Sequence, residues 1–225
     1  SRLVLASDNM LILTIGDRGQ SDRAQDPFDH AGSMLRIKTD GSIPADNPFA
    51  AGAKGAPEIW SIGHRNPQAV VVDPVTGTVY ANEHGPRGGD EINVLVEGDN
   101  YGWPIVSRGI DYTGALVTPF DAYEGMQDPL VNWTPSIAPA GMAIYHGEVF
   151  PEWEGDLLVA ALIAGDAGTP SGHVRRVDLE NGDVVGQSIL FGELEARIRD
   201  VRVAPDGTVW LLTDDANGQL IQVTR

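Results

Sequence analysis

The 225-residue chain contains no cysteine, only two lysines and no long apolar run. Without cysteine it has no disulfides, no thiolate metal ligands and no cysteine nucleophile. A bilayer-spanning helix needs about 20 consecutive apolar residues, so none is expected, and insertion into a membrane is excluded. The net charge of −17 and a pI near 4.4 exclude a surface built to bind nucleic acid or anionic membranes, since both need clustered Lys and Arg.

Hydrophobic residues make up 42% of the chain, which is ample for a packed core, so disorder is not expected. An acidic, lysine-poor surface is typical of a periplasmic or secreted protein, and also of one adapted to high salt. The chain starts with "SRLVLAS", which already has the pattern of a strand, and no signal segment opens it. We therefore expect a trimmed or incomplete chain.

A short β-rich unit recurs: an apolar strand, a turn with Asp, Asn, Pro or Gly, and a second apolar strand. It occurs as "LVLASDNMLILTIGD" (3–17), "VVVDPVTGTVYANEHG" (70–85), "VRVAPDGTVWLLTDD" (201–215) and, more loosely, over 142–162. Further strand candidates between these copies are "SMLRIKT", "EINVLVEG", "HVRRVDL" and "QLIQVT". Strand pairs repeating at this period are typical of a β-propeller, in which each blade covers its neighbour.

A β-sandwich with long loops is the alternative that the repeats leave open. The polar or Gly/Pro-rich stretches 18–34 and 105–135 are expected to be long loops. In a propeller such loops shape the mouth of the central channel, where ligands bind.

The stretch "ANEHGPRGGDEINVLVEGDNYGWP" (81–104) combines acids, glycines and prolines around a strand-like run. Its glycines allow backbone carbonyls to point at one spot, and calcium prefers carbonyl and carboxylate oxygens. The Gly85 and Pro86 carbonyls are candidates for one ion, and Glu91 with the Tyr101 carbonyl for another. A solvated acidic turn is the alternative.

Two arginine clusters stand out in this acidic chain. In "SIGHRNPQAVVVD", Arg65 and Asn66 precede a strand, where Arg65 could face an anion or form a surface ion pair. In "EARIRDVRV", Arg197 and Arg199 lie two apart on a strand and hence on one face. Two guanidiniums on one face need an anion between them, or carboxylates from the neighbouring blade.

Taken in order, the motifs "RLVLASDNMLILTIGD", "IGHRNPQ", "EHGPRGGDEIN", "GDNYGWP", "APAGMAIY" and "RIRDVRVAPDGTVWLLTD" resemble the soluble aldose sugar dehydrogenases. These are the pyrroloquinoline quinone (PQQ) enzymes of the glucose and sorbosone dehydrogenase family. The resemblance covers residues 1–225. It implies an all-β, six-bladed propeller of which about four blades are represented here, as a single domain over 1–225 that lacks its N-terminal blades.

The resemblance also gives these clusters roles. Gly85 and Pro86 match the carbonyls that hold the calcium bound to PQQ, and Glu91 and Tyr101 match a second, structural calcium site. Arg65 would stabilise charge on the reduced quinone, and Asp17 matches a carboxylate that orients the catalytic base. The positions that match cofactor-binding residues are Arg65, Asn66, His84, Ser136, Arg197 and Arg199.

The implied reaction is oxidation of an aldose at its anomeric carbon to a lactone, with electrons passed to an external acceptor. The family's base histidine would lie about three residues ahead of Ser1, and none of the five histidines present matches it. A lysine that meets a PQQ carboxylate has no clear counterpart near "SGHVRRV". An aromatic residue beside the cofactor is shifted by one, to Trp133, leaving Thr134 in its place.

Two further functions remain open: a catalytically inactive, calcium-stabilised propeller that serves as a binding module, and a calcium-dependent propeller lactonase. The lactonase would need inward Asn, Asp and Glu ligands rather than an arginine pair. A partial propeller would expose apolar blade faces, so self-association or pairing with the missing N-terminal portion is expected.

Overall fold

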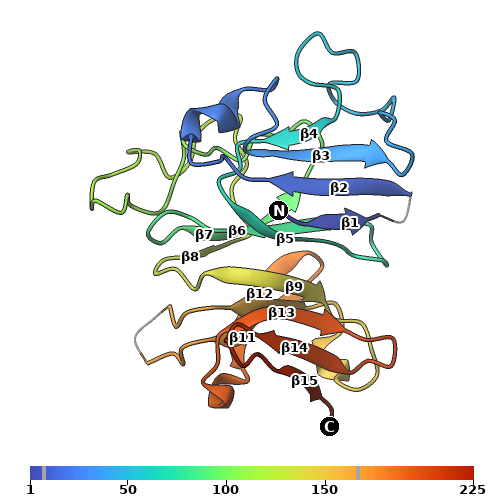
Figure 1. Cartoon of the computed structure of the whole chain (residues 1–225), viewed down its shortest axis with the longest axis vertical. Coiled ribbons are helices and arrows are strands. Elements are labelled where there is room, and N and C mark those ends of the chain that lie inside the picture. Colours follow the sequence, from blue (N-terminus) through green and yellow to red (C-terminus); the bar gives the residue numbers. More distant parts are fainter. Residues whose placement is uncertain (7–8, 166–167) are drawn as a thin grey trace. The chain divides into compact units, whose positions relative to one another are not determined.

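The computed structural model describes residues 1–6, 9–165 and 168–225, and in them the chain is built from β-strands and three short 3₁₀ helices (Figure 1). It divides into two compact units, Ser1–Thr134 and Pro135–Arg225. Each unit holds two antiparallel sheets whose strands follow one another in chain order. This arrangement is that of propeller blades, and it confirms the all-β class with about four blades. Whether the chain is one domain over 1–225 stays a prediction.

In the first unit, the two four-stranded sheets are consecutive meanders. Their strands are β1 (Leu3–Leu5), β2 (Met10–Ile15), β3 (Ser33–Lys38) and β4 (Ile59–Ile62), then β5 (Pro67–Val72), β6 (Val79–Glu83), β7 (Asp90–Leu95) and β8 (Val131–Trp133). The helix η1 (Ser21–Gln25) lies between β2 and β3.

The second unit has one four-stranded and one three-stranded sheet. Their strands are β9 (Pro139–Ile144), β10 (Leu157–Ala161), β11 (His173–Glu180) and β12 (Asp183–Leu190), then β13 (Ile198–Val203), β14 (Val209–Thr213) and β15 (Leu220–Val223). The helix η2 (Pro151–Trp153) lies between β9 and β10, and η3 (Gly192–Leu194) lies between β12 and β13.

Asp-containing turns close the predicted hairpins in the same way. In the turn between β13 and β14, the Thr208 N–H donates to Asp206 Oδ1 at 3.0 Å, and Ala204 N–H donates to the Thr208 carbonyl at 2.9 Å. Gly207 has φ of +80°, a conformation that glycine adopts without the steric cost of a side chain. The repeated "DG" signal therefore marks hairpins because its side chain and its glycine each satisfy the turn geometry.

Apolar residues from facing sheets fill the interior of each unit. In the first unit the core consists of Ile12, Met34, Trp60, Val70, Val79, Ala81, Leu95 and Tyr101. In the second it is centred on Tyr145, Trp153, Leu158, Val174, Val201 and Leu211. Alternation along the strands places these side chains on one face, so each sheet buries the face that its neighbour covers.

The predicted strands are all present, but three were not foreseen: β4, β8 and β12. The predicted loop 18–34 contains η1 and the start of β3, and 105–135 contains β8. β8 is only three residues long, and β12 alternates exposed and half-buried positions, which is typical of a sheet edge. Their patterns are too short or too polar to stand out in the sequence.

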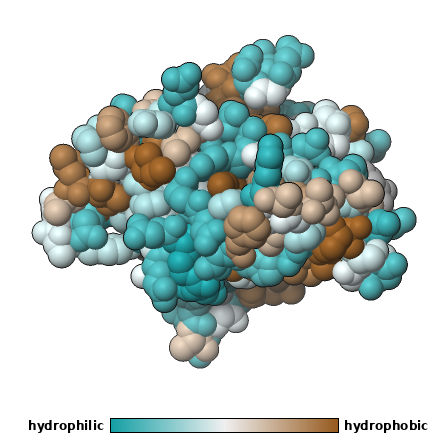
Figure 2. All heavy atoms as spheres, turned by 90° about the horizontal axis from the view of Figure 1, so that it is seen from above, coloured by the Kyte–Doolittle hydropathy of each residue, from teal (hydrophilic) through white to brown (hydrophobic). Residues whose placement is uncertain are grey.

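The face shown in Figure 2 is mainly polar, with hydrophobic residues in separate patches. This agrees with the high proportion of acids. Among the described residues, no helix combines the length and the apolar character that crossing a membrane requires.

Candidate functional site

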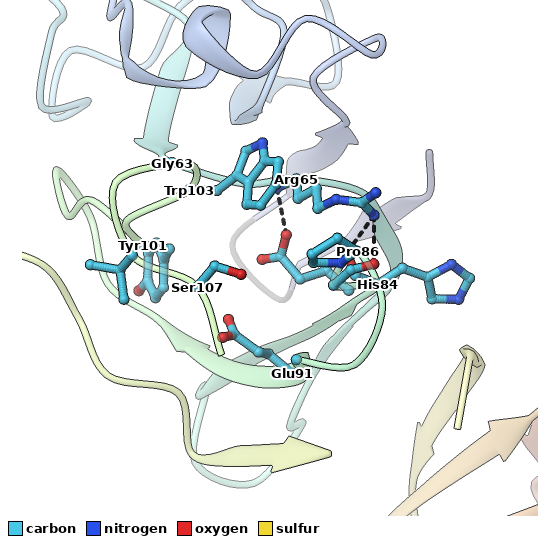
Figure 3. Close-up of a pocket in the computed structure, with 12 residues that line it drawn as sticks. Gly63, Arg65, His84, Pro86, Glu91, Tyr101, Trp103 and Ser107 are labelled. Atoms are coloured by element: carbon cyan, nitrogen blue, oxygen red, sulfur yellow. Dashed lines mark hydrogen bonds between the residues drawn. The ribbon is translucent and has the colours of Figure 1, made fainter. Parts of the chain in front are cut away.

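One end of the first unit gathers three segments that carry most of the predicted site residues. They are the connection after β4, the turn after β6 and the residues around Tyr101 (Figure 3). The helix η1 joins this end, because Gln25 Nε2 donates to the Trp103 carbonyl at 2.7 Å. Between the segments lies a cavity of about 20 Å³, which is room for about one water molecule or ion. Its lining includes Arg65, Glu83, His84, Gly85, Pro86, Glu91, Tyr101, Trp103 and Ser107.

Arg65 is fixed at both its backbone and its side chain. Its N–H donates to Glu83 Oε2 at 2.6 Å, and its Nη1 donates to the carbonyls of His84 at 3.1 Å and Gly85 at 2.6 Å. The guanidinium carbon lies 5.2 Å from the centre of the Trp103 ring and 6.0 Å from that of Tyr112. Arg65 is therefore a positioned cation between two aromatic rings rather than a mobile surface side chain.

A buried chain of hydrogen bonds leads to the carboxylate that holds the Arg65 backbone. Ser61 Oγ lies 3.0 Å from His64 Nε2, and His64 Nδ1 lies 2.9 Å from Glu83 Oε1. The His64 ring also stacks on Tyr101, with 4.7 Å between ring centroids. Ser61 and His64 are fully buried and Glu83 nearly so. Glu83 was not among the predicted site residues, although its place beside "HGP" was a signal for it.

Asn66 and His84 lie next to Arg65 and are linked through the backbone. The His84 N–H donates to the Asn66 carbonyl at 3.1 Å, and Asn66 Oδ1 accepts from Gln68 Nε2 at 3.1 Å. Figure 3 shows the His84 ring pointing away from Glu91 and from the cavity.

Asp17 belongs to the same group of residues. Its Oδ2 accepts the indole N–H of Trp103 at 2.9 Å, and its backbone N–H donates to the Arg65 carbonyl at 2.9 Å. Asp17 therefore orients Trp103, one of the two rings that flank Arg65. The predicted orientation of a histidine by Asp17 stays a prediction.

Glu91 lines the cavity, and its surroundings disfavour the charged form of its carboxyl group. Burial raises its pKa to about 8, and the negative charge of Glu83 adds to the shift. Glu91 pairs with Glu83 across β6 and β7, and its Oε2 accepts from Asn93 Nδ2 at 3.4 Å. Figure 3 shows its carboxylate pointing toward Ser107. Glu83 is buried and Glu91 half-buried, and a cation beside two adjacent acids would stabilise their charged forms.

The turn that contains Gly85 and Pro86 approaches its own backbone closely. The Gly85 N–H donates to Asp90 Oδ1 at 3.0 Å, and a Cβ at Gly85 would collide with the carbonyl oxygens of Gly88 and Gly89. The Gly85 carbonyl faces the Arg65 guanidinium. No group of three or more His, Asp or Glu side chains is placed to hold a metal in the part of the chain that the structure describes. A cation here would depend on carbonyl oxygens together with Glu91.

The buried tyrosine hydroxyl of Tyr101 is used internally. It donates to the Val94 carbonyl at 2.7 Å and accepts from the Val96 N–H at 2.8 Å. Burial raises the pKa of Tyr101 well above its usual value. Only the backbone carbonyl of Tyr101 therefore remains as the metal ligand that the sequence predicted.

The second unit carries Ser136, Arg197 and Arg199. Arg197 Nη2 and Arg199 Nη2 both meet Asp214 Oδ2, at 2.8 and 3.0 Å. These contacts, from Arg197 first, lower the pKa of Asp214. Asp214 follows β14 of the same sheet, so the alternative that placed the partner on a neighbouring blade was wrong. Ser136 Oγ accepts the Ala138 N–H at 3.1 Å.

Thr134 occupies the position at which the resemblance implies an aromatic residue beside the cofactor. Trp133 is buried in β8, and Thr134 Oγ1 accepts the Gly89 N–H at 2.8 Å. Thr134 thus supports the glycine turn with its hydroxyl.

Comparison with known proteins places this geometry in context. The family model described as Glucose / Sorbosone dehydrogenase matches residues 1–222. The chain is 43% identical over 235 residues to an uncharacterized protein of Synechocystis, covering 99% of this chain and 55% of the relative. It is 38% identical over 226 residues to the aldose sugar dehydrogenase YliI of Escherichia coli, covering 99% of this chain and 59% of that protein. The chain therefore spans somewhat more than half the length of these relatives.

Solved structures are similar along the whole chain. A crystal structure of a glucose dehydrogenase matches with a TM-score of 0.93 and 37% identity, covering 100% of this chain and 63% of that one. The PQQ-bound form of the aldose sugar dehydrogenase from Streptomyces coelicolor matches with a TM-score of 0.75 and 26% identity, covering 99% of this chain and 60% of that one.

Proposed function

The chain belongs to the glucose/sorbosone dehydrogenase family, and from that premise we propose that it carries the cofactor site of a PQQ- and calcium-dependent aldose sugar dehydrogenase. The reaction is oxidation of an aldose at its anomeric carbon to a lactone, with electrons leaving to an external acceptor. Relatives support this proposal: one is named an aldose sugar dehydrogenase, and a similar structure is described as PQQ-bound. We place the protein in the periplasm or outside the cell.

The observation that carries the proposal is the fixed position of Arg65. A buried carboxylate holds its backbone, and two carbonyls and two rings hold its guanidinium. A cation held in this way stabilises negative charge that develops on an oxygen, without reorganising during the reaction. A surface ion pair would need none of this support.

The residues present fit the two groups that the proposal requires. For calcium, Glu83 and Glu91 lie side by side on β6 and β7, the raised pKa of Glu91 marks a carboxyl group whose charged form a cation would stabilise, and the cavity beside it has room for one ion. The Gly85 and Pro86 carbonyls are the proposed ligands of the calcium that binds together with PQQ, and Glu91 with the Tyr101 carbonyl those of a second, structural calcium.

For PQQ, which carries carboxylates, the fit lies in the arginines. Arg197 and Arg199 share a single carboxylate, Asp214, so their guanidiniums keep further N–H donors for an anion. The assignment of these two arginines to PQQ comes from the resemblance in sequence alone. The same holds for Arg65, Asn66, His84 and Ser136.

Within this chain, the proposed chemistry is one of binding and orientation. When bound, PQQ supplies the acceptor for the two electrons that leave the sugar. Arg65 would supply N–H donors to the oxygen that gains negative charge, and Asp17 keeps the Trp103 ring beside Arg65. We assign no proton acceptor among the five histidines of the chain.

The two alternatives make different demands on the same residues. A calcium-stabilised binding module would keep the Glu91 site and have no use for a pair of arginines on one strand. A lactonase would need calcium alone. The Arg197 and Arg199 pair therefore favours the dehydrogenase.

The test is titration of the chain with PQQ in the presence and absence of calcium, followed by absorbance. Saturable binding that requires calcium is expected, with affinity lowered about tenfold or more in Arg199→Ala, because a charge-assisted contact is lost. Arg202→Ala is the matched control, since Arg202 lies on the same strand and pairs with Asp200 at 3.1 Å. Equal loss in both variants, or no binding by the folded wild type, would contradict the proposal. Hydrolysis of a lactone without PQQ would favour the lactonase.

A further inference from the structure

Tyr112 is an exposed aromatic side chain held beside the candidate site. It is 71% exposed, and the Arg65 guanidinium carbon lies over its ring at 6.0 Å from the centroid. Its hydroxyl makes no hydrogen bond with any residue that the structure describes. One face of the ring is thus toward Arg65, and the remainder is open to solvent. An exposed ring next to a positioned cation needs an explanation.

The backbone keeps this ring in place. Tyr112 lies in a turn in which the Asp111 N–H donates to the Ala115 carbonyl at 2.8 Å and the Gly114 N–H donates to the Asp111 carbonyl at 2.8 Å. Asp111 Oδ1 accepts both the N–H and the hydroxyl of Thr113, at 2.8 and 2.6 Å. The turn is joined to the turn after β6, because Ile110 and Arg87 exchange backbone hydrogen bonds of 2.9 and 3.1 Å. The backbone that carries the ring is therefore held close to the turn after β6.

Two other exposed aromatics of the same loop behave differently. Phe120 and Tyr123 pack edge to face, with ring centroids 5.4 Å apart, so each covers part of the other. Among the described residues, the Tyr112 ring packs against no other aromatic ring and has a cation–π contact with Arg65. Thr134, where the resemblance places an aromatic residue, instead supports Gly89 through its hydroxyl. Tyr112 is consequently the exposed ring that adjoins Arg65.

An aldose ring matches this surface chemically. A pyranose has faces of C–H groups and a rim of hydroxyls, and the negative face of an aromatic ring attracts the C–H groups. The Asp111 carboxylate, one residue before Tyr112 in the chain, is an acceptor for a sugar hydroxyl. Sites for small ligands commonly combine one apolar surface with a few placed polar groups.

We propose that Tyr112 is the platform on which the aldose ring stacks, on the face that Arg65 leaves open, and that it contributes to the binding of the sugar rather than to the chemical step. The inference rests on the proposed function, since it names how the substrate of that site is held.

The test compares the wild type, Tyr112→Ala, Tyr112→Phe and Tyr123→Ala in the full chain loaded with PQQ and calcium, with D-glucose as the probe. Tyr112→Ala is expected to raise KM about tenfold with kcat within about twofold, because the contact is made equally in the ground and transition states. Tyr112→Phe keeps the ring and should stay within about twofold of the wild type, as should Tyr123→Ala. An unchanged KM, or a fall in kcat alone, would show that Tyr112 only positions Arg65 and would overturn the inference.

A second measurement separates this inference from the proposed function. Saturation-transfer NMR of D-glucose with the PQQ-free chain reports sugar contact without any turnover. If the wild type reduces no dye with PQQ, the proposed function fails, while saturation transfer that is lost in Tyr112→Ala and kept in Tyr112→Phe still supports the sugar platform. Absence of transfer in the wild type, or equal transfer in Tyr112→Ala, overturns it.

Discussion

At the scale of single residues, burial decides which acids of this strongly acidic chain affect the candidate site. Two histidine–glutamate pairs show the contrast. His30 and Glu58 meet at 2.6 Å on the surface, whereas His64 and Glu83 meet at 2.9 Å in the interior. The surface pair competes with water, whereas the interior pair is shielded from water. The Glu83 carboxylate also joins two segments of the chain, because it accepts from the Arg65 N–H and from Asn93 Nδ2.

Glu83→Ala is therefore expected to lower the free energy of unfolding by about 2–4 kcal/mol, because several buried donors lose their acceptor. Glu58→Ala is the matched control and should cost less than about 1 kcal/mol. Urea unfolding of both variants measures the difference. Glu83→Ala should also weaken PQQ binding, since the Arg65 backbone loses its anchor. Equal costs for the two variants would mean that the interior pair is not a structural support.

His173 supplies a pH-dependent prediction. It is fully buried, neither ring nitrogen has a hydrogen-bond partner among the described residues, and burial followed by the charge of Arg175 lowers its pKa to about 4. Between about pH 6.5 and 4 the unfolded chain binds a proton at this residue that the folded chain does not, so stability falls as the pH falls through this window.

Replacing His173 by Leu removes that contribution. The difference in unfolding free energy between the wild type and His173→Leu should move by about 2 kcal/mol between pH 7 and pH 4, to the disadvantage of the wild type. Urea unfolding at a series of pH values measures this change. A difference that is constant with pH would contradict the burial of a neutral imidazole.

At the scale of elements, turns rather than strands carry the candidate site. The strands β6 and β7 set the pairing of Glu83 with Glu91, but the turn between them presents the carbonyls, and its form depends on close contact between glycines. The same hairpin connection elsewhere, between β5 and β6, has Gly77 at φ of +77° with open space around it. Gly85 is thus required because there is no space for a side chain, and Gly77 because of its backbone conformation.

Gly85→Ala should therefore disturb the turn, because its Cβ would meet the carbonyl oxygens of Gly88 and Gly89. We expect a loss of more than about 2 kcal/mol in unfolding free energy, or a displaced turn that no longer responds to calcium. Gly77→Ala, which meets no atom within 4 Å, should cost about 1 kcal/mol. Thermal unfolding with and without calcium distinguishes them. Unaltered calcium response in Gly85→Ala would remove this turn from the proposed site.

At the scale of the whole molecule, the net charge of −17 makes cations generally favourable. A specific calcium site must be separated from this general screening, which any salt provides. The proposed site differs because it joins a half-buried carboxyl group, Glu91, to carbonyl oxygens.

Calcium is expected to raise the melting temperature beyond the effect of NaCl at the same ionic strength, and a chelator should reverse the gain. At a calcium concentration 100 times Kd, the stabilisation from one site is about 2.7 kcal/mol. Glu91→Gln should abolish the calcium-specific part and leave the response to NaCl intact. Identical shifts with calcium and NaCl in the wild type would exclude the site.

The sequence by itself determined the all-β class, the paired strands and the family, because turn residues, alternation and short motifs are local signals that neighbouring residues set. It also predicted Arg65, Gly85 and Glu91 as candidate site residues. Only the tertiary structure decided which groups support them: Glu83 under Arg65, Asp214 between Arg197 and Arg199, and Tyr112 beside the Arg65 guanidinium. These contacts join segments whose separation in sequence carries no periodic signal, and burial, which raises the pKa of Glu91, exists only once the sheets have packed.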